Sequence, residues 1–131
     1  MQIGLECFMD EQISSMIASE NRHGECEIQS KKECVVYDTN EDHYLEGYLE
    51  EIMDAFTVAK HLRVSETDVR VGYLHTFLAR WKVFKVDEKS IQKIIKAICR
   101  QRYQDEPELF DEKVTIRELF SCLLYTSDAA D

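Results

Sequence analysis

The sequence predicts a mainly α-helical protein, a small helical bundle with a short knuckle-like or β segment near its N-terminus. Two amphipathic patterns carry this prediction: an apolar stripe between residues 44 and 59, and an isoleucine stripe between residues 91 and 98. A third observation is the short run Val35-Val36-Tyr37, which is typical of a strand or extended segment. With 131 residues, 44% of them hydrophobic, the chain is long enough to bury one core.

The first helix is expected before the polar stretch 21–24. Four apolar residues recur there at helical spacing on one face: Met9, Ile13, Met16 and Ile17. The polar residues that follow favour the end of the helix, and the extended segment around residues 35–37 comes next.

The clearest expected element is a long helix that extends to Ala59. The residues before it, Asp38, Thr39 and Asn40, are good N-cap candidates. Its apolar stripe consists of Tyr44, Leu45, Tyr48, Leu49, Ile52, Met53, Phe56 and Ala59. Acidic residues occupy the opposite face, so one side of this helix is expected in the core.

Two further helices are expected in the second half of the chain. The first has an apolar face of Leu74, Phe77, Leu78 and Trp81, and we expect Trp81 at the centre of the core. The second begins at the N-cap candidate Asp87, and Pro107 ends the helical pattern. Its buried face consists of Ile91, Ile94, Ile95 and Ile98, and its outer face of Lys89, Lys93, Lys96 and Arg100. The segment 114–116 is short, and its sequence is compatible with either a helix or a strand.

The charge balance restricts the classes of partner. The chain has 26 acidic and 16 basic residues and a formal net charge of −10, which disfavours binding nucleic acid or a membrane through the whole surface. The basic outer face could neutralise phosphates, but solvated surface or protein contact is the preferred interpretation. The sequence contains neither a long apolar stretch nor a signal-peptide pattern, so we expect a cytoplasmic protein with reduced thiols and no disulfide framework.

Several segments together resemble a known family. They are Leu5-Glu6-Cys7-Phe8-Met9-Asp10-Glu11, Gly24-Glu25-Cys26, Val35-Val36-Tyr37-Asp38-Thr39, and the helix with Leu74, Leu78, Trp81 and Phe84. In this pattern the chain resembles the HEPN-like domain at the N-terminus of bacterial RES proteins, over roughly residues 3–116.

This resemblance implies a two-part protein. Residues 1–121 would form the HEPN-like domain, followed in cis by a RES domain, which is related to ADP-ribosyltransferases and degrades NAD as the toxin of a toxin–antitoxin system. The domain itself would be a non-catalytic accessory that folds, restrains or docks its neighbour. An antitoxin, or a second copy bound through the helices, would be a further partner.

The last ten residues, 122–131, resemble a translated sequencing adaptor. We therefore expect a non-native tail there, which is excluded from the reasoning about the fold. Residues 1–121 would then be the N-terminal part of a longer chain, and the RES domain would lie beyond them.

The resemblance also implies a zinc site with four thiolates in two Cys-x-x-Cys knuckles. Gly4 and Gln29 stand where two of these cysteines are expected. The remaining candidate ligands are Cys7, His23, Cys26 and Cys34. Their chemistry suits zinc but their spacing is poor. A small zinc-stabilised binding module is therefore one alternative, and a degenerate site that holds no cofactor is the other.

An enzymatic alternative depends on Arg70 and His75. Catalytic HEPN proteins carry Arg-x(4–6)-His, in which the cation binds phosphate and the imidazole assists metal-independent cleavage of RNA. The spacing of Arg70 and His75 matches this pattern. A match of this kind arises readily by chance in a chain of this composition, so a structural arginine and a core-edge histidine are the competing interpretation.

Overall fold

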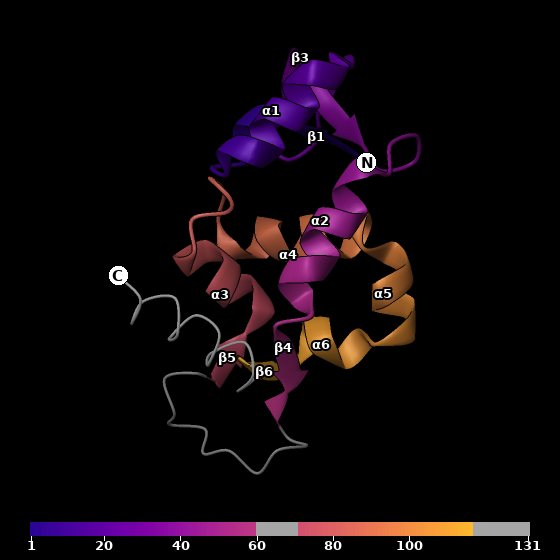
Figure 1. The fold of residues 1–131 in the computed structure, drawn as a ribbon. Helices are drawn as coiled ribbons and strands as arrows, with labels where there is room; N and C mark the ends of the chain where they lie inside the picture. The colour runs from indigo at the N-terminus through magenta and orange to yellow at the C-terminus, as the bar shows by residue number, and fades with distance from the viewer. Residues whose placement is uncertain (60–70, 117–131) are drawn as a thin grey trace, which may run out of the picture.

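The computed structural model describes residues 1–59 and 71–116. Within these ranges, six α-helices and a short 3-10 helix combine with two three-stranded antiparallel sheets. The prediction of a mainly α-helical bundle was therefore wrong, because the fold mixes helices and sheets. The two sheets lie at opposite ends of the molecule, with helices α2 (Tyr44–Met53) and α4 (Glu88–Ile98) between them (Figure 1).

The N-terminal sheet is built from nearby segments of the chain. Strands β1 (Gln2–Gly4) and β2 (His23–Cys26) both pair antiparallel with the central strand β3 (Lys31–Asp38). The prediction of an extended segment at residues 35–37 is confirmed, since it lies within β3. The 3-10 helix η1 (Leu5–Cys7) follows β1 directly.

Helix α1 (Glu11–Glu20) is confirmed where the sequence predicts it. Its N-cap is Asp10, whose carboxylate accepts a hydrogen bond from the backbone N–H of Ile13 at 3.0 Å. Its C-cap is Asn21 with φ of 51°, a left-handed conformation that asparagine tolerates well. Ile13 and Ile17 are fully buried, whereas Met9 lies before the helix and is 41% exposed.

Helix α2 is shorter than predicted. It ends at Met53, and after a turn the chain continues as strand β4 (Phe56–Val58). The expected caps at residues 38–40 form a separate turn, and His43 holds the N-cap position without a side-chain bond. Phe56 and Ala59 continued the helical spacing, but the β-branched Thr57 and Val58 between them suit a strand.

The C-terminal sheet explains why the bundle prediction failed. Strand β6 (Lys113–Ile116) lies between β4 and β5 (Val71–Tyr73) and pairs antiparallel with both. Each of the three strands is only three or four residues long and its partners are distant in sequence. Local periodicity reports nothing about such pairing, which is decided when the chain folds back on itself.

The remaining helices are α3 (Leu74–Arg80), α5 (Arg100–Asp105) and α6 (Pro107–Asp111). The predicted isoleucine face of α4 is confirmed, as all four of its residues are buried. Pro107 follows the end of α5 and occupies the first turn of α6, where its missing N–H costs nothing. The single helix predicted from Asp87 to Pro107 is instead divided at Cys99 into α4 and α5. Trp81 is 39% exposed, so the expectation that it lies at the centre of the core was wrong.

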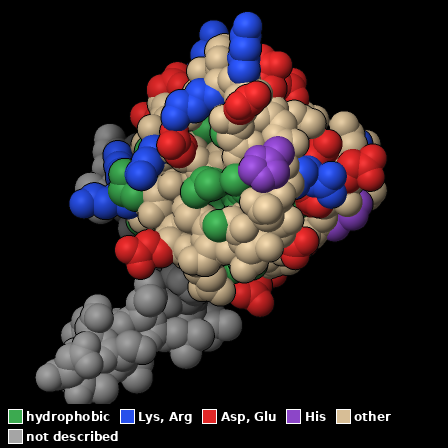
Figure 2. All heavy atoms as spheres, turned by 90° about the horizontal axis from the view of Figure 1, so that it is seen from above, with side chains coloured by type: hydrophobic (Ala, Val, Ile, Leu, Met, Phe, Trp, Pro, Cys, Tyr) green, Lys and Arg blue, Asp and Glu red, His purple; other side chains and the backbone are tan. Residues whose placement is uncertain are grey.

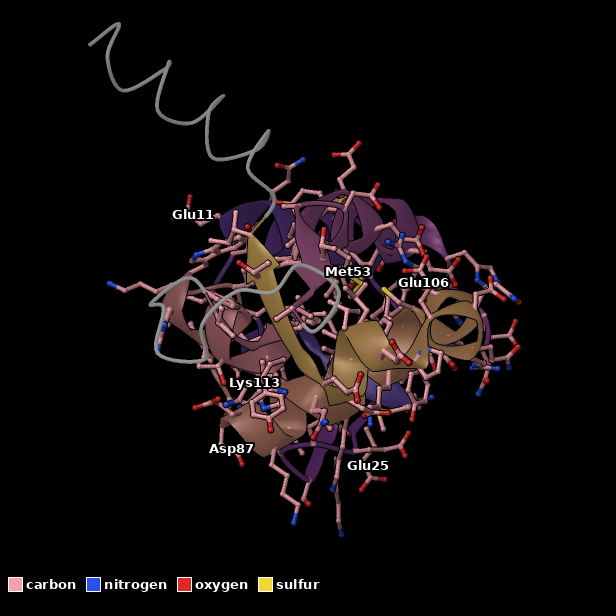
Figure 3. The ribbon with its side chains drawn as sticks, turned by 90° about the horizontal axis from the view of Figure 1, so that it is seen from below. Glu11, Glu25, Met53, Asp87, Glu106 and Lys113 are labelled. Carbon is pink, nitrogen blue, oxygen red and sulfur yellow. The ribbon has the colours of Figure 1, made fainter. Side chains whose placement is uncertain are left out.

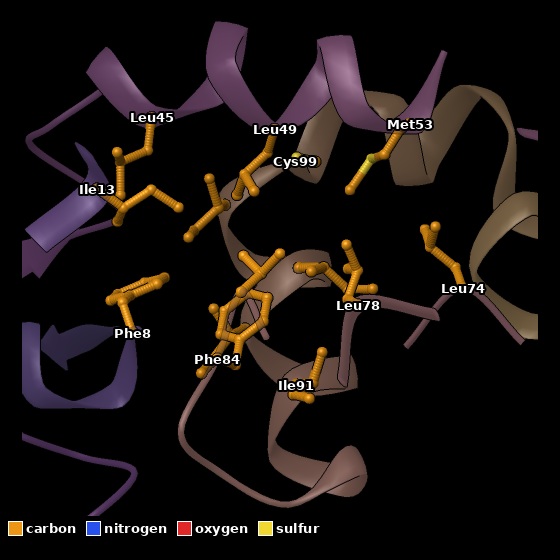
Figure 4. Close-up of a cluster of buried hydrophobic side chains, with 14 of the residues drawn as sticks. Phe8, Ile13, Leu45, Leu49, Met53, Leu74, Leu78, Phe84, Ile91 and Cys99 are labelled. Atoms are coloured by element: carbon orange, nitrogen blue, oxygen red, sulfur yellow. The ribbon is translucent and has the colours of Figure 1, made fainter. Parts of the chain in front are cut away.

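A single hydrophobic cluster joins the two ends of the molecule. In Figure 4, Leu45, Leu49 and Met53 extend from α2 towards the side chains of α3 and α4. Phe8, from the N-terminal region, lies 5.2 Å from Phe84 between ring centroids. Figure 3 labels the fully buried Met53 within the body of the molecule, and Glu11, Asp87 and Glu25 near its outline.

The surface of the N-terminal end carries charges of both signs. Figure 2 shows lysine and arginine side chains interspersed with aspartate and glutamate around a small hydrophobic patch. In the two described ranges, the helices are too short and too polar for any of them to cross a membrane.

Candidate functional site

Two buried cysteines meet at the N-terminal sheet. Cys7 ends η1 and Cys26 ends β2, and both side chains are fully buried. Their sulfur atoms lie 3.6 Å apart, which is direct contact between two thiols that are distant in sequence. The backbone carbonyl of Cys7 accepts a hydrogen bond from the N–H of Lys85 at 2.8 Å, so this contact is tied to the loop between α3 and α4.

Gly4 lies against Cys26 and leaves little room for a side chain. A Cβ atom at Gly4 would lie 3.0 Å from the Cβ and 3.2 Å from the Sγ of Cys26, closer than side chains normally approach. The backbone of Gly4 has φ of −66°, which any residue adopts. The glycine is therefore required by the close approach of Cys26 and not by its own conformation.

A third thiol lies at the edge of the same cluster. Cys34, on β3, is half-buried, and its sulfur lies 3.5 Å from the carbonyl oxygen of Gly24. A Cβ at Gly4 would lie 3.5 Å from the sulfur of Cys34, so Gly4 separates Cys26 from Cys34. Cys26 and Cys34 both line a pocket of about 200 Å³ that also borders Gln29.

The two buried thiols have opposite pKa shifts. Burial raises the pKa of Cys7 to about 12, and its hydrogen bond with Cys26 acts in the same direction. Burial also tends to raise the pKa of Cys26, but the backbone N–H groups of Gln29, Gly4 and Ile28 outweigh it, so the pKa of Cys26 lies below its usual value. Of these donors, Gln29 lies 3.4 Å from the sulfur. The backbone donors therefore favour a thiolate at Cys26 more than at Cys7.

His23 does not join the thiols. It lies on β2 next to Gly24, which is paired with Cys34, and neighbouring residues of a strand face opposite sides of the sheet. The side chain of His23 is exposed. Of the four predicted zinc ligands, the structure therefore brings Cys7 and Cys26 into contact, places Cys34 beside them, and leaves His23 apart.

The sulfurs of Cys7 and Cys26 are spaced as two of the four ligands of a zinc ion would be. Two thiolates bound to tetrahedral zinc at about 2.3 Å lie about 3.8 Å apart, close to the 3.6 Å between Cys7 and Cys26. The remaining two positions of the implied knuckles are Gly4, which has little space for a side chain, and the exposed Gln29. Across residues 1–59 and 71–116, no three potential ligands gather around one metal position. The residues present do not fit the implied four-thiolate site.

The structure describes one residue of the predicted ribonuclease pair, His75. Arg70 lies outside the described residues. His75 is in the first turn of α3, with its side chain 16% exposed and its ring stacked on Tyr73 at 5.4 Å. Burial lowers the pKa of His75, and its Nε2 lies 3.9 Å from a carboxylate oxygen of Glu88. Because Arg70 is not described, the ribonuclease pair stays a prediction.

The predicted basic face of α4 is partly occupied by contacts within the chain. Lys96 pairs with Asp111 at 2.5 Å and lies over the ring of Tyr103. Arg100 donates a hydrogen bond to Asn40 at 3.2 Å. These contacts direct two of the four cations of this face towards the protein itself.

Sequence analysis missed the charge cluster around Arg102. Its guanidinium lies 2.9 Å from Asp54, 3.8 Å from Glu50 and 3.5 Å from Glu106. The cluster borders a pocket of about 470 Å³ at the opposite end of the molecule from the thiols, between β4 and α6. Acidic side chains surround this arginine, so the pocket disfavours an anionic ligand such as a phosphate.

Comparison with known proteins does not assign this site. No protein-family model, no curated protein and no solved structure matches the chain.

Proposed function

We propose that this chain is a non-catalytic accessory domain that adjoins, in cis, a RES-type NAD-degrading domain of a cytoplasmic bacterial toxin protein. Its role would be to fold, restrain or dock that domain, or to present a surface to an antitoxin or a second copy. The helical-bundle fold is not part of this proposal. The domain boundary at residue 121 and the tail at residues 122–131 lie outside the described residues and stay predictions.

One observation carries the proposal. The two segments that resemble the family's cysteine knuckles, Leu5–Cys7 and Gly24–Cys26, come together in space although they are distant in sequence. Their cysteine sulfurs lie 3.6 Å apart, and the third resembling segment, residues 35–37, lies in the strand that pairs with both β1 and β2. This is the arrangement that two facing knuckles require, even though two of the four thiols are absent from the sequence.

The decisive experiment is to sequence the encoding gene past codon 121. We expect the reading frame to continue into a RES domain, and a stop codon or an unrelated domain there would overturn the proposal. The extended protein should then consume NAD, whereas the present chain should not. RNA cleavage by the present chain that is lost in His75→Ala would instead support the ribonuclease alternative.

A small zinc-stabilised module is the second candidate function. The observation in its favour is the sulfur–sulfur distance of 3.6 Å, which is close to the spacing of two zinc-bound thiolates. The test is the zinc content of protein purified without chelator. A zinc-to-protein ratio near one would support this candidate, and a ratio near zero would eliminate it.

A further inference from the structure

We propose that Cys7 and Cys26 form a reversible redox pair, which a peroxide joins in a disulfide and a small thiol reductant reopens. This is a modification site of the present chain, and it depends neither on a downstream domain nor on a metal. Disulfides of reducing compartments are usually transient and redox-sensing, which is the behaviour proposed for this pair.

The geometry brings the reacting atoms close together. The two sulfurs are 3.6 Å apart, and a disulfide bond is about 2.05 Å long, so each sulfur has to move by less than about 1 Å. Rotation about a Cα–Cβ bond provides such a shift. Both segments are held in place: the carbonyl of Cys7 binds the N–H of Lys85, and β2 pairs with β3 up to Cys26. The encounter therefore needs no large movement of the backbone.

The surroundings decide which thiol reacts with the oxidant. The backbone N–H of Gln29 donates a hydrogen bond to the sulfur of Cys26 at 3.4 Å, and the Cys7 sulfur lies 3.6 Å from the same atom. Cys26 also lines the pocket that Lys31 borders, whereas Cys7 does not line it. The nearby Lys31 ammonium interacts favourably with thiolates at Cys26 and Cys34. Cys26 is therefore the nucleophile of the pair.

A pocket lies beside this thiol, although the Cys26 side chain has no exposed surface. The pocket of about 200 Å³ lined by Cys26 and Cys34 is large enough for hydrogen peroxide, which is close to water in size. Lys31 lies at the pocket and forms an exposed ion pair with Glu6. Cys26 itself is fully buried, so we expect a slow, selective reaction that depends on this pocket.

Oxidation of the two cysteines proceeds in two steps. The thiolate of Cys26 attacks one oxygen of hydrogen peroxide, the O–O bond breaks, and a sulfenic acid and hydroxide are formed. The Cys7 sulfur then gives up its proton and attacks the Cys26 sulfur, so that the S–S bond forms as the S–O bond breaks and water leaves. The two cysteines lose two electrons, which reduce the peroxide.

The test maps disulfides by mass spectrometry in the full chain. Reduced protein, freed of metal with a chelator, is treated with hydrogen peroxide, alkylated and digested with trypsin without reduction. Trypsin places the three thiols of the cluster in separate peptides, residues 1–22, 23–31 and 33–60. We expect peptides 1–22 and 23–31 to be linked, with the link lost on treatment with dithiothreitol.

Matched variants make the result specific. Cys34→Ser and Cys99→Ser should retain the link, since Cys34 is beside the pair and Cys99 is buried elsewhere in the core. Cys26→Ser should abolish it. In the native protein this link should exceed the link from 23–31 to 33–60 by at least about tenfold, whereas urea-unfolded protein should form a mixture of links, because the fold holds Cys7 and Cys26 in contact. A predominant link from 23–31 to 33–60, or the same mixture of links in the folded and unfolded protein, would overturn the proposal. The assay contains no NAD, so its failure leaves the accessory-domain proposal untouched.

Discussion

The two small sheets are built in contrasting ways. The N-terminal sheet joins three strands within residues 2–38, and a carbon added at Gly4 would lie only 3.0 Å from the Cβ of Cys26. The C-terminal sheet joins three strands drawn from residues 56 to 116, and large aromatic and aliphatic side chains hold it to the helices. The N-terminal sheet depends on the close approach of Gly4 and Cys26, whereas the C-terminal sheet depends on the burial of large apolar side chains.

Loss of volume at the C-terminal end should have the largest effect. Phe110 in α6 is fully buried and contacts Tyr103 edge-on, with 5.4 Å between ring centroids. Phe110→Ala should lower the free energy of unfolding by about 3–5 kcal/mol, measured by urea denaturation. The control is Trp81→Ala, whose side chain is 39% exposed and whose loss should cost clearly less. Equal losses for the two variants would contradict the contrast between a buried Phe110 and a half-exposed Trp81.

Added volume at the N-terminal end should have the next largest effect. Gly4→Ala places a Cβ against Cys26 and should destabilise the protein by about 1–3 kcal/mol. The matched substitution is Gly47→Ala in α2, where no atom lies within 4 Å of the new Cβ. Because alanine favours a helix over glycine, Gly47→Ala should stabilise the protein by about 0.5–1 kcal/mol. In thermal unfolding, the midpoint should fall for Gly4→Ala and rise for Gly47→Ala. A shift of both midpoints in the same direction would contradict this prediction.

The link between the N-terminal region and α2 should have a moderate effect. Asp10 caps α1 and also accepts a hydrogen bond from the Tyr48 hydroxyl at 3.0 Å. Asp10→Ala removes both and should cost about 1–2 kcal/mol in chemical denaturation. Tyr48→Phe removes only the second bond, so it should cost less; a Tyr48→Phe loss as large as that of Asp10→Ala would mean that the cap contributes nothing.

The smallest effect concerns pH. The Arg22 guanidinium binds both oxygens of Asp42 at 2.8 Å and holds the pKa of Asp42 below its ordinary value of 3.8, against the opposing effect of burial. Because the folded-state pKa is depressed, this pair stabilises the protein above pH 3.8, and the contribution is lost as the pH falls through the lower folded-state pKa. Asp42→Asn should reduce the pH dependence of unfolding below pH 4, and an unchanged acid profile would show that other carboxylates dominate.

The helices could be predicted from sequence wherever one apolar face repeats over several turns. The isoleucine face of α4, the paired Ile13 and Ile17 of α1, and the strand around residues 35–37 all lie where the pattern indicates. The C-terminal sheet was not predicted, because its strands are too short for a period of two to stand out. The sequence indicated Cys7 and Cys26 as candidate zinc ligands. It did not indicate that Gly4 packs closely against Cys26 or that the backbone N–H of Gln29 donates to the Cys26 sulfur, because the residue types carry no signal for either role.

The sequence by itself determined the buried isoleucine face of α4 and that a helix ends before Pro107, because these depend on neighbours within a few residues. Tertiary structure alone decided that Phe56–Val58 is a strand, that Trp81 is half-exposed, and that two distant cysteines share one buried site. The physical reason is the range of the interactions. Helical hydrogen bonds and amphipathic spacing are local, whereas strand pairing and the contact between Cys7 and Cys26 exist only once distant segments have been packed together.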